Sequence, residues 1–172
     1  MGSLFEGLKM LLIICFIFGL LGTLTWAGPQ GRTVCPSGTF AYKDGSEWSC
    51  YKFYREQLTF EDAEEECQNR WKGHLASFHS DKQAKSIAAY VAKENMESRF
   101  VWMGLQRDED SDMITGWYWV DGSRSRYRKW YYGEPNGKTE FCATLYALAG
   151  HLTWVDLSCV YKFPFLCKWK PT

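Results

Sequence analysis

The sequence lacks the motifs that mark common catalytic sites. It contains no G-x-S-x-G nucleophile turn and no H-E-x-x-H zinc motif, and its three histidines are His74, His79 and His151. No two cysteines form a C-x-x-C pair, which argues against a cysteine zinc site. The histidines are the obvious candidates for a general base, but none belongs to a recognisable nucleophile motif. We therefore predict that the protein is not an enzyme.

A net charge is also absent. The 20 lysines and arginines are balanced by 20 aspartates and glutamates, so the formal net charge is +0. Without an overall positive field, nothing draws the whole chain toward nucleic acid or an anionic membrane. We expect no nucleic-acid partner.

Linkers and repeats are missing as well. No Pro/Gly/Ser-rich stretch, internal repeat or low-complexity tract divides the chain, and 172 residues suit one domain of ordinary size. Hydrophobic residues make up 46% and aromatic residues 17%, which is enough for a packed core. One core is therefore expected.

The N-terminus has the features of an export signal. Lys9 precedes an apolar run from Met10 to Leu21, and Thr25 and Ala27 offer small side chains for signal peptidase. We predict a signal peptide at 1–27 and a secreted domain at 28–172 that does not insert into a membrane. The alternative is a type II membrane anchor, because the apolar character continues almost to the length of a spanning helix. The short stretch between Gly28 and Cys35 argues against it, since it is too short a stalk.

Cysteine usage agrees with export. Removal of the signal also removes Cys15 and leaves an even set: Cys35, Cys50, Cys67, Cys142, Cys159 and Cys167. In an exported chain an even set predicts disulfides, here three. Six cysteines allow fifteen connectivities, and the residues alone do not choose among them.

Helix signals are concentrated in the first half of the mature chain. Thr59 with Asp62 caps a helix from about Phe60 to Arg70, and Ser80 with Gln83 forms a capping box for a second helix that ends near Lys93. Short β-rich runs follow at 100–105, 117–120, 142–145, 152–155 and 164–169. This order predicts an α+β fold in which two helices flank small antiparallel sheets.

A set of ordered local patterns is more specific than these periodicities. They are Cys35-Pro36-Ser37-Gly38, Cys50-Tyr51-Lys52-Phe53, Ala63 to Cys67, His74-Leu75-Ala76-Ser77, Trp102-Met103-Gly104-Leu105, Trp117 to Ser123 and Phe165-Leu166-Cys167-Lys168. Together they resemble the C-type lectin-like domain family over about Cys35 to Lys170. Within that family the chain resembles small secreted single-domain members such as regenerating (Reg) proteins and reptile venom lectins.

The resemblance implies a C-type lectin-like fold with a long ligand-binding loop. It also implies three disulfides, which join Cys67 to Cys167, Cys142 to Cys159, and Cys35 to Cys50 in an N-terminal hairpin. The tryptophans at 102, 117, 119 and 154 match core positions of the family and are expected to pack in the interior. With every mature cysteine paired, any homo-oligomer would be noncovalent.

The resemblance also implies a calcium and carbohydrate site. It carries the roles of metal ligand and sugar ligand to Glu134, Asn136, Glu140 and Asp156. Calcium prefers six to eight oxygen ligands, which carboxylates and amide carbonyls supply. The order Glu134-Pro135-Asn136 is similar to that of mannose-type lectins, so glycans with mannose-type terminal sugars are the expected partners. Pro135 is expected to be cis.

One position departs from the family pattern. The usual Trp-Asn-Asp reads Trp154-Val155-Asp156 here, and Val155 supplies neither an oxygen nor an amide donor. We expect this change to weaken a calcium-assisted mannose-type lectin. The alternative is a domain that keeps the fold but binds protein, mineral or a bacterial surface without calcium.

Two charged clusters leave alternatives open. Asp108, Glu109, Asp110 and Asp112 suit either a second calcium site or a solvated loop. Arg124, Arg126, Arg128 and Lys129 interleave with Tyr127 and with the aromatic run from Trp130 to Tyr132. This second cluster is either a cationic, aromatic surface for sulfated or phosphorylated glycans or an exposed strand with inward-facing aromatic residues.

Overall fold

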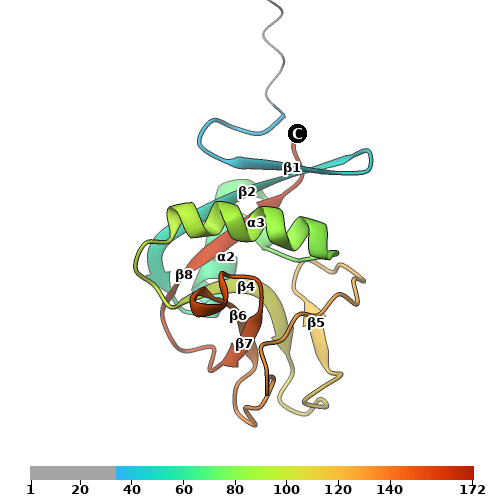
Figure 1. Cartoon of the computed structure of the whole chain (residues 1–172), viewed down its shortest axis with the longest axis vertical. Coiled ribbons are helices and arrows are strands. Elements are labelled where there is room, and N and C mark those ends of the chain that lie inside the picture. The colour runs from blue at the N-terminus through green and yellow to red at the C-terminus, as the bar shows by residue number, and fades with distance from the viewer. Residues whose placement is uncertain (1–33) are drawn as a thin grey trace, which may run out of the picture. The chain divides into compact units, whose positions relative to one another are not determined.

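The computed structural model describes residues 34–172. The predicted signal peptide at 1–27 lies outside the described residues. The elements, most of which are labelled in Figure 1, are β1 (Phe40–Asp44), β2 (Glu47–Leu58), α2 (Phe60–Trp71), β3 (His74–Leu75), α3 (Asp81–Glu94), β4 (Phe100–Arg107), β5 (Trp117–Trp119), β6 (Cys142–Tyr146), the short 3-10 helix η1 (Ala147–Ala149), β7 (Trp154–Leu157) and β8 (Phe163–Trp169). Among residues 34–172, no helix is both long enough and apolar enough to cross a bilayer.

Both helices begin at the predicted caps. The Thr59 side chain accepts a hydrogen bond from the backbone N–H of Asp62, and the Ser80 side chain accepts one from the backbone N–H of Gln83. These bonds satisfy donors that the first turn of a helix cannot pair within itself. Each predicted helix is thereby confirmed, and each runs one residue further than expected.

The strands form one mixed sheet of eight strands. Its main path runs β1-β2-β8-β4-β6-β7, with β3 paired to β8 and β5 paired to β4. All pairings are antiparallel except that of β4 with β8, which meet in parallel at Trp102 and Phe165. The small sheets expected from the spacing of the runs are thus joined, because the central strands β4 and β8 pair on both edges.

The two helices cover opposite faces of this sheet. Residues alternate between the faces along each strand. On β4, Val101, Met103 and Leu105 share a core with the apolar face of α3, whereas Trp102 belongs to the core that contains the buried face of α2. Trp102, Trp117, Trp119 and Trp154 are all buried, which confirms that they are core residues.

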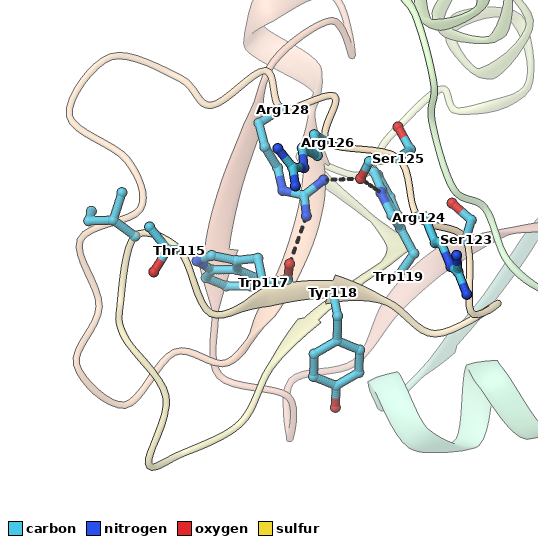
Figure 2. A pocket seen from close by; sticks show the side chains of 10 residues that line it. Thr115, Trp117, Tyr118, Trp119, Ser123, Arg124, Ser125, Arg126 and Arg128 are labelled. Atoms are coloured by element: carbon cyan, nitrogen blue, oxygen red, sulfur yellow. Dashed lines mark hydrogen bonds between the residues drawn. The ribbon is translucent and has the colours of Figure 1, made fainter.

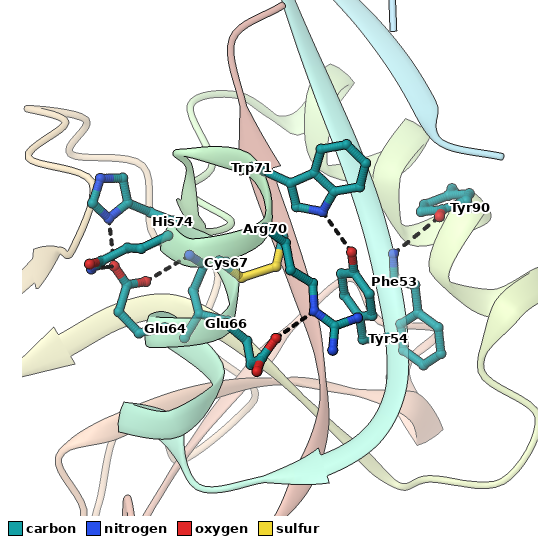
Figure 3. Close-up of a disulfide and its surroundings, with 12 residues drawn as sticks. Phe53, Tyr54, Glu64, Glu66, Cys67, Arg70, Trp71, His74 and Tyr90 are labelled. Atoms are coloured by element: carbon teal, nitrogen blue, oxygen red, sulfur yellow. Dashed lines mark hydrogen bonds and ion pairs between the residues drawn. A yellow bond between two sulfur atoms is a disulfide. The ribbon is translucent and has the colours of Figure 1, made fainter. Parts of the chain in front are cut away.

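Three disulfides tie this architecture together, and their pairing is the one that the resemblance implied. Cys67 joins Cys167, Cys142 joins Cys159, and Cys35 joins Cys50. Figure 3 shows that the first of these links α2 directly to β8. Because it closes a separation of 100 residues, this bond constrains the unfolded chain most strongly.

Candidate functional site

The Glu134-Pro135-Asn136 segment lies in the long stretch between β5 and β6, and β7 holds it in place. Asp156 of β7 is 2% exposed, and its two carboxylate oxygens accept hydrogen bonds from the backbone N–H groups of Asn136 (3.1 Å) and Gly137 (2.9 Å). The Glu134–Pro135 peptide bond is cis, as expected. A buried carboxylate on a strand therefore fixes the backbone of the loop.

The carboxyl groups of three of the four predicted ligands, Glu134, Glu140 and Asp156, lie close enough to affect one another's charge. Burial and the neighbouring carboxyl groups of Asp156 and Glu140 raise the pKa of Glu134 to about 7. Burial and Asp156 also raise the pKa of Glu140. Both shifts have the sign expected when carboxyl groups are buried and lie near like charges.

One buried oxygen atom of this carboxylate cluster makes no hydrogen bond within residues 34–172. The Oε2 atom of Glu134 is buried and has no hydrogen-bond partner among residues 34–172, although buried carboxylate oxygens are normally paired. The Glu140 carboxylate lies against the backbone of Gly137, so closely that a Cβ atom at Gly137 would overlap it. The Asn136 side chain is exposed.

The donor set has the chemistry of a calcium site, because carboxylate and amide oxygens are the ligands that calcium prefers. An orphaned buried oxygen and mutually repelling carboxylates are what a bound cation would relieve. In the described residues, however, no three His, Cys, Asp or Glu side chains already stand in a metal-binding arrangement. Glu134, Asn136, Glu140 and Asp156 are the residues that would hold the ion, and the charges of Asp156 and Glu140 already act on Glu134.

Val155 contributes nothing polar to this cluster. Its side chain is 6% exposed, and its backbone carbonyl accepts a hydrogen bond from the Thr144 hydroxyl at 3.3 Å. The position that supplies an amide in the family pattern is therefore filled here by a buried hydrocarbon.

Arg107, which the sequence patterns did not single out, holds the loop at residues 137–140 by hydrogen bonds to its backbone. Its guanidinium donates to the backbone carbonyls of Ser111 (3.2 Å), Gly137 (3.2 Å) and Glu140 (3.5 Å), and it lies over the rings of Phe141 and Trp117. Arg107 is 4% exposed, and no ion pair with a carboxylate forms in the described part of the chain. A permanent cation thus cross-links the loop beside the carboxylates. The alternation of Met103 and Leu105 could have indicated an inward position for Arg107.

Asp112 in the acidic cluster after β4 accepts hydrogen bonds from its own loop. The Asp112 carboxylate accepts hydrogen bonds from the backbone N–H groups of Ile114 and Thr115 and from the Thr115 hydroxyl. Asp108 accepts one from the Tyr118 hydroxyl at 3.0 Å. These bonds are typical of an exposed turn and favour the solvated-loop interpretation.

A serine, a histidine, a lysine and an aspartate meet beside β8. Lys168 Nζ lies 2.8 Å from Ser77 Oγ, 3.1 Å from His79 Nε2 and 3.6 Å from the Asp121 carboxylate, and Ser77 donates to Asp121. Burial lowers the pKa of Lys168 and of His79, and the Lys168 charge lowers that of His79 further. Ser77 is 0% exposed, so its hydroxyl is out of reach of a substrate. We interpret this cluster as a structural tie between β8 and the turn at Asp121.

Comparisons with known proteins agree with the fold. The family model "Lectin C-type domain" matches residues 56–169. The chain is 34% identical to human regenerating islet-derived protein 4 over 96% of this chain and 98% of that protein. It is 32% identical to a C-type lectin of Hydrophis hardwickii over 91% of this chain and 94% of that protein. The crystal structure of human lithostathine superposes with a TM-score of 0.73 at 31% identity, covering 86% of this chain and 99% of that one.

The model match, the two relatives and the superposition cover the same region as the sequence patterns, the helices and the disulfides. The chain therefore belongs to the C-type lectin domain family.

Proposed function

We propose that this protein is a secreted lectin that binds mannose-type sugars with the help of calcium, at a site formed by Glu134, Asn136, Glu140 and Asp156. The observation that carries the proposal is the buried Oε2 atom of Glu134, unpaired within the described residues, beside two further carboxylates. A bound calcium ion would supply positive charge to these oxygens and open coordination positions for sugar hydroxyls.

The residues of the chain would bind the sugar through its hydroxyl groups. Each hydroxyl donates to a carboxylate, such as that of Glu134, and accepts from an amide N–H, such as that of Asn136. Val155 leaves the second hydroxyl without an amide donor. Loss of one hydrogen bond of this kind typically weakens binding by about 1.5–3 kcal/mol, or about tenfold to 150-fold. We therefore expect weak single-site binding that gains from noncovalent clustering of several chains.

The test is a calorimetric titration of calcium into the chelator-treated mature domain, with and without mannose. We expect saturable calcium binding that mannose strengthens and that Glu134→Gln abolishes. The matched control is Glu109→Gln, which removes the same charge from an exposed loop position. A folded wild-type domain that takes up no calcium would reject the proposal.

A variant that gains affinity for mannose tests the proposal more sharply than one that loses it. Val155→Asn restores an amide at the position where the family pattern has one, and we expect it to tighten mannose binding about tenfold in calcium. Because Val155 is buried, the melting temperature of the variant must be measured alongside. A stable variant with unchanged mannose affinity would argue that the sugar does not bind beside residue 155.

A second candidate is a calcium-independent binding domain for a protein, a mineral or a bacterial surface. Two observations favour it: Val155 is a buried hydrocarbon, and Arg107 already holds the loop with a permanent positive charge. Competition separates the two candidates. Mannose and a chelator should release a lectin from its target and should leave a calcium-independent binder attached.

A further inference from the structure

A pocket that contains none of the four candidate ligands lies between β5 and residues 123–128. Its volume is about 560 Å³, within the range of roughly 300–1,000 Å³ that is typical of sites for small ligands. Figure 2 shows the pocket from close by. It is lined by Arg124, Arg126 and Arg128, by Ile114 and Thr115, and by residues of β5 and the adjoining serines. Among residues 34–172, no aspartate or glutamate lines it.

Arg124 and Arg126 reach this pocket because burial alternates along 123–127. Ser125 and Tyr127 turn toward the protein: the Ser125 hydroxyl donates to the carbonyl of Phe78, and the Tyr127 hydroxyl donates to Asp81. Arg124 and Arg126 are exposed on the alternate positions. Tyr118 points away from the arginines in Figure 2, and its hydroxyl donates to Asp108 and so belongs to the opposite side of β5.

Arg128 forms the rigid floor of the pocket. Its guanidinium donates to the backbone carbonyls of Trp117 (2.7 Å), Ser125 (3.0 Å) and Tyr127 (2.8 Å), and it lies 5.3 Å from the centre of the Trp119 ring. Partial burial lowers its pKa, yet arginine stays protonated at neutral pH. No carboxylate neutralises this fixed charge within the described residues.

Arg124 and Arg126 supply free donors above this floor. Of the three arginines in Figure 2, only Arg128 makes hydrogen bonds to the other residues drawn. Asp112, in the loop before β5, already accepts hydrogen bonds from the backbone N–H groups of Ile114 and Thr115, two residues that line the pocket. Two guanidinium groups therefore face the pocket without an anionic partner in the part of the chain that the structure describes.

We propose that this pocket binds sulfate esters on an extracellular polysaccharide, independently of calcium. The planar guanidinium fork matches a tetrahedral oxyanion with two parallel hydrogen bonds. Arg124 and Arg126 are separated by a single residue, so the chain can place their Cα atoms up to about 7 Å apart. Two neighbouring guanidinium groups suit a polymer that carries successive charges better than a single small ion. Sulfate esters are the strong anions of extracellular polysaccharides, which an exported protein meets.

The test measures binding of the mature domain to immobilised heparin in the presence of a chelator. We expect micromolar or tighter binding that weakens steeply with salt and is lost when the heparin is fully desulfated. Arg124→Gln combined with Arg126→Gln should lower the affinity at least about tenfold. Both side chains are exposed, so near-ultraviolet circular dichroism should stay unchanged.

The matched control is Lys82→Gln combined with Lys85→Gln, which removes two positive charges from exposed positions of α3. Equal losses in the two double variants would overturn the proposal, because they would reduce the effect to net charge. Equal binding to desulfated heparin, hyaluronan or polyphosphate would also overturn it. Glu134→Gln should leave heparin binding unchanged, so failure here and failure of the calcium-assisted lectin site are distinguishable.

Discussion

Glu134→Gln should change how the stability of the calcium-free protein depends on pH. The pKa of Glu134 is raised from an ordinary value of 4.5 to about 7, first by burial and then by Asp156 and Glu140. A carboxyl group whose pKa is higher in the folded than in the unfolded state binds its proton more tightly when folded. Its contribution is therefore fully present below about pH 4.5 and is lost as the pH rises through about 7.

The magnitude follows from the difference between the two pKa values. Their separation corresponds to an upper limit of about 3.4 kcal/mol. Because the Glu134 carboxyl keeps partial contact with solvent, screening reduces this to on the order of 1–2 kcal/mol. The glutamine variant carries no charge at any pH. It should therefore be more stable than the wild type by that amount at about pH 8 and similar to it at about pH 4.

The assay is urea unfolding followed by circular dichroism in a chelator, at several pH values between about 4 and 8. Glu109→Gln is the control, since its side chain is exposed, and it should keep the wild-type profile. Added calcium should make the wild type more stable than Glu134→Gln at about pH 8. At roughly a hundredfold excess over its dissociation constant, calcium should stabilise the wild type by about 2.7 kcal/mol and leave the stability of the glutamine variant unchanged. Parallel pH profiles for wild type and Glu134→Gln would refute the reasoning.

Two further predictions concern the parts that hold the loop and the fold. Arg107→Met should lower the free energy of unfolding by about 2–4 kcal/mol, because it removes a buried guanidinium and leaves three half-buried carbonyls without their donor. Arg55→Gln at an exposed ion pair should cost less than about 1 kcal/mol. Equal effects of the two variants in urea unfolding would contradict a special role for Arg107. Replacing Cys67 and Cys167 by serine should cost about 4.7 kcal/mol in the chain-entropy model, and thermal unfolding that hardly changes would show that the unfolded chain is restricted by other means.

The helix caps could be predicted from the sequence without a structure. Thr59 and Ser80 bond to backbone groups only three residues away, so their helices could be predicted from short-range geometry alone. The strand predicted at 152–155 instead runs from Trp154 to Leu157. Its boundaries depend on pairing with β6, which lies outside the local pattern.

The candidate site could be predicted as a set of residues but not as an electrostatic unit. Only the family resemblance singled out Glu134, Glu140 and Asp156. The sequence did not indicate that Asp156 would hold the loop backbone or that Glu134 would keep an oxygen unpaired within residues 34–172. Those properties depend on burial and on the distances between segments far apart in the chain.

The sequence by itself determined the features that depend on neighbouring residues and on residue type: the helix caps, the even set of cysteines, the absence of net charge and the family pattern. Only the tertiary structure decided that the strands join in one sheet and that Arg107 is buried among backbone carbonyls. It also decided that Arg128 becomes a fixed cation while Arg124 and Arg126 stay exposed. The physical reason is that strand pairing and charge interactions arise between segments that meet only after folding, whereas a local pattern indicates at most which face of a strand a residue occupies.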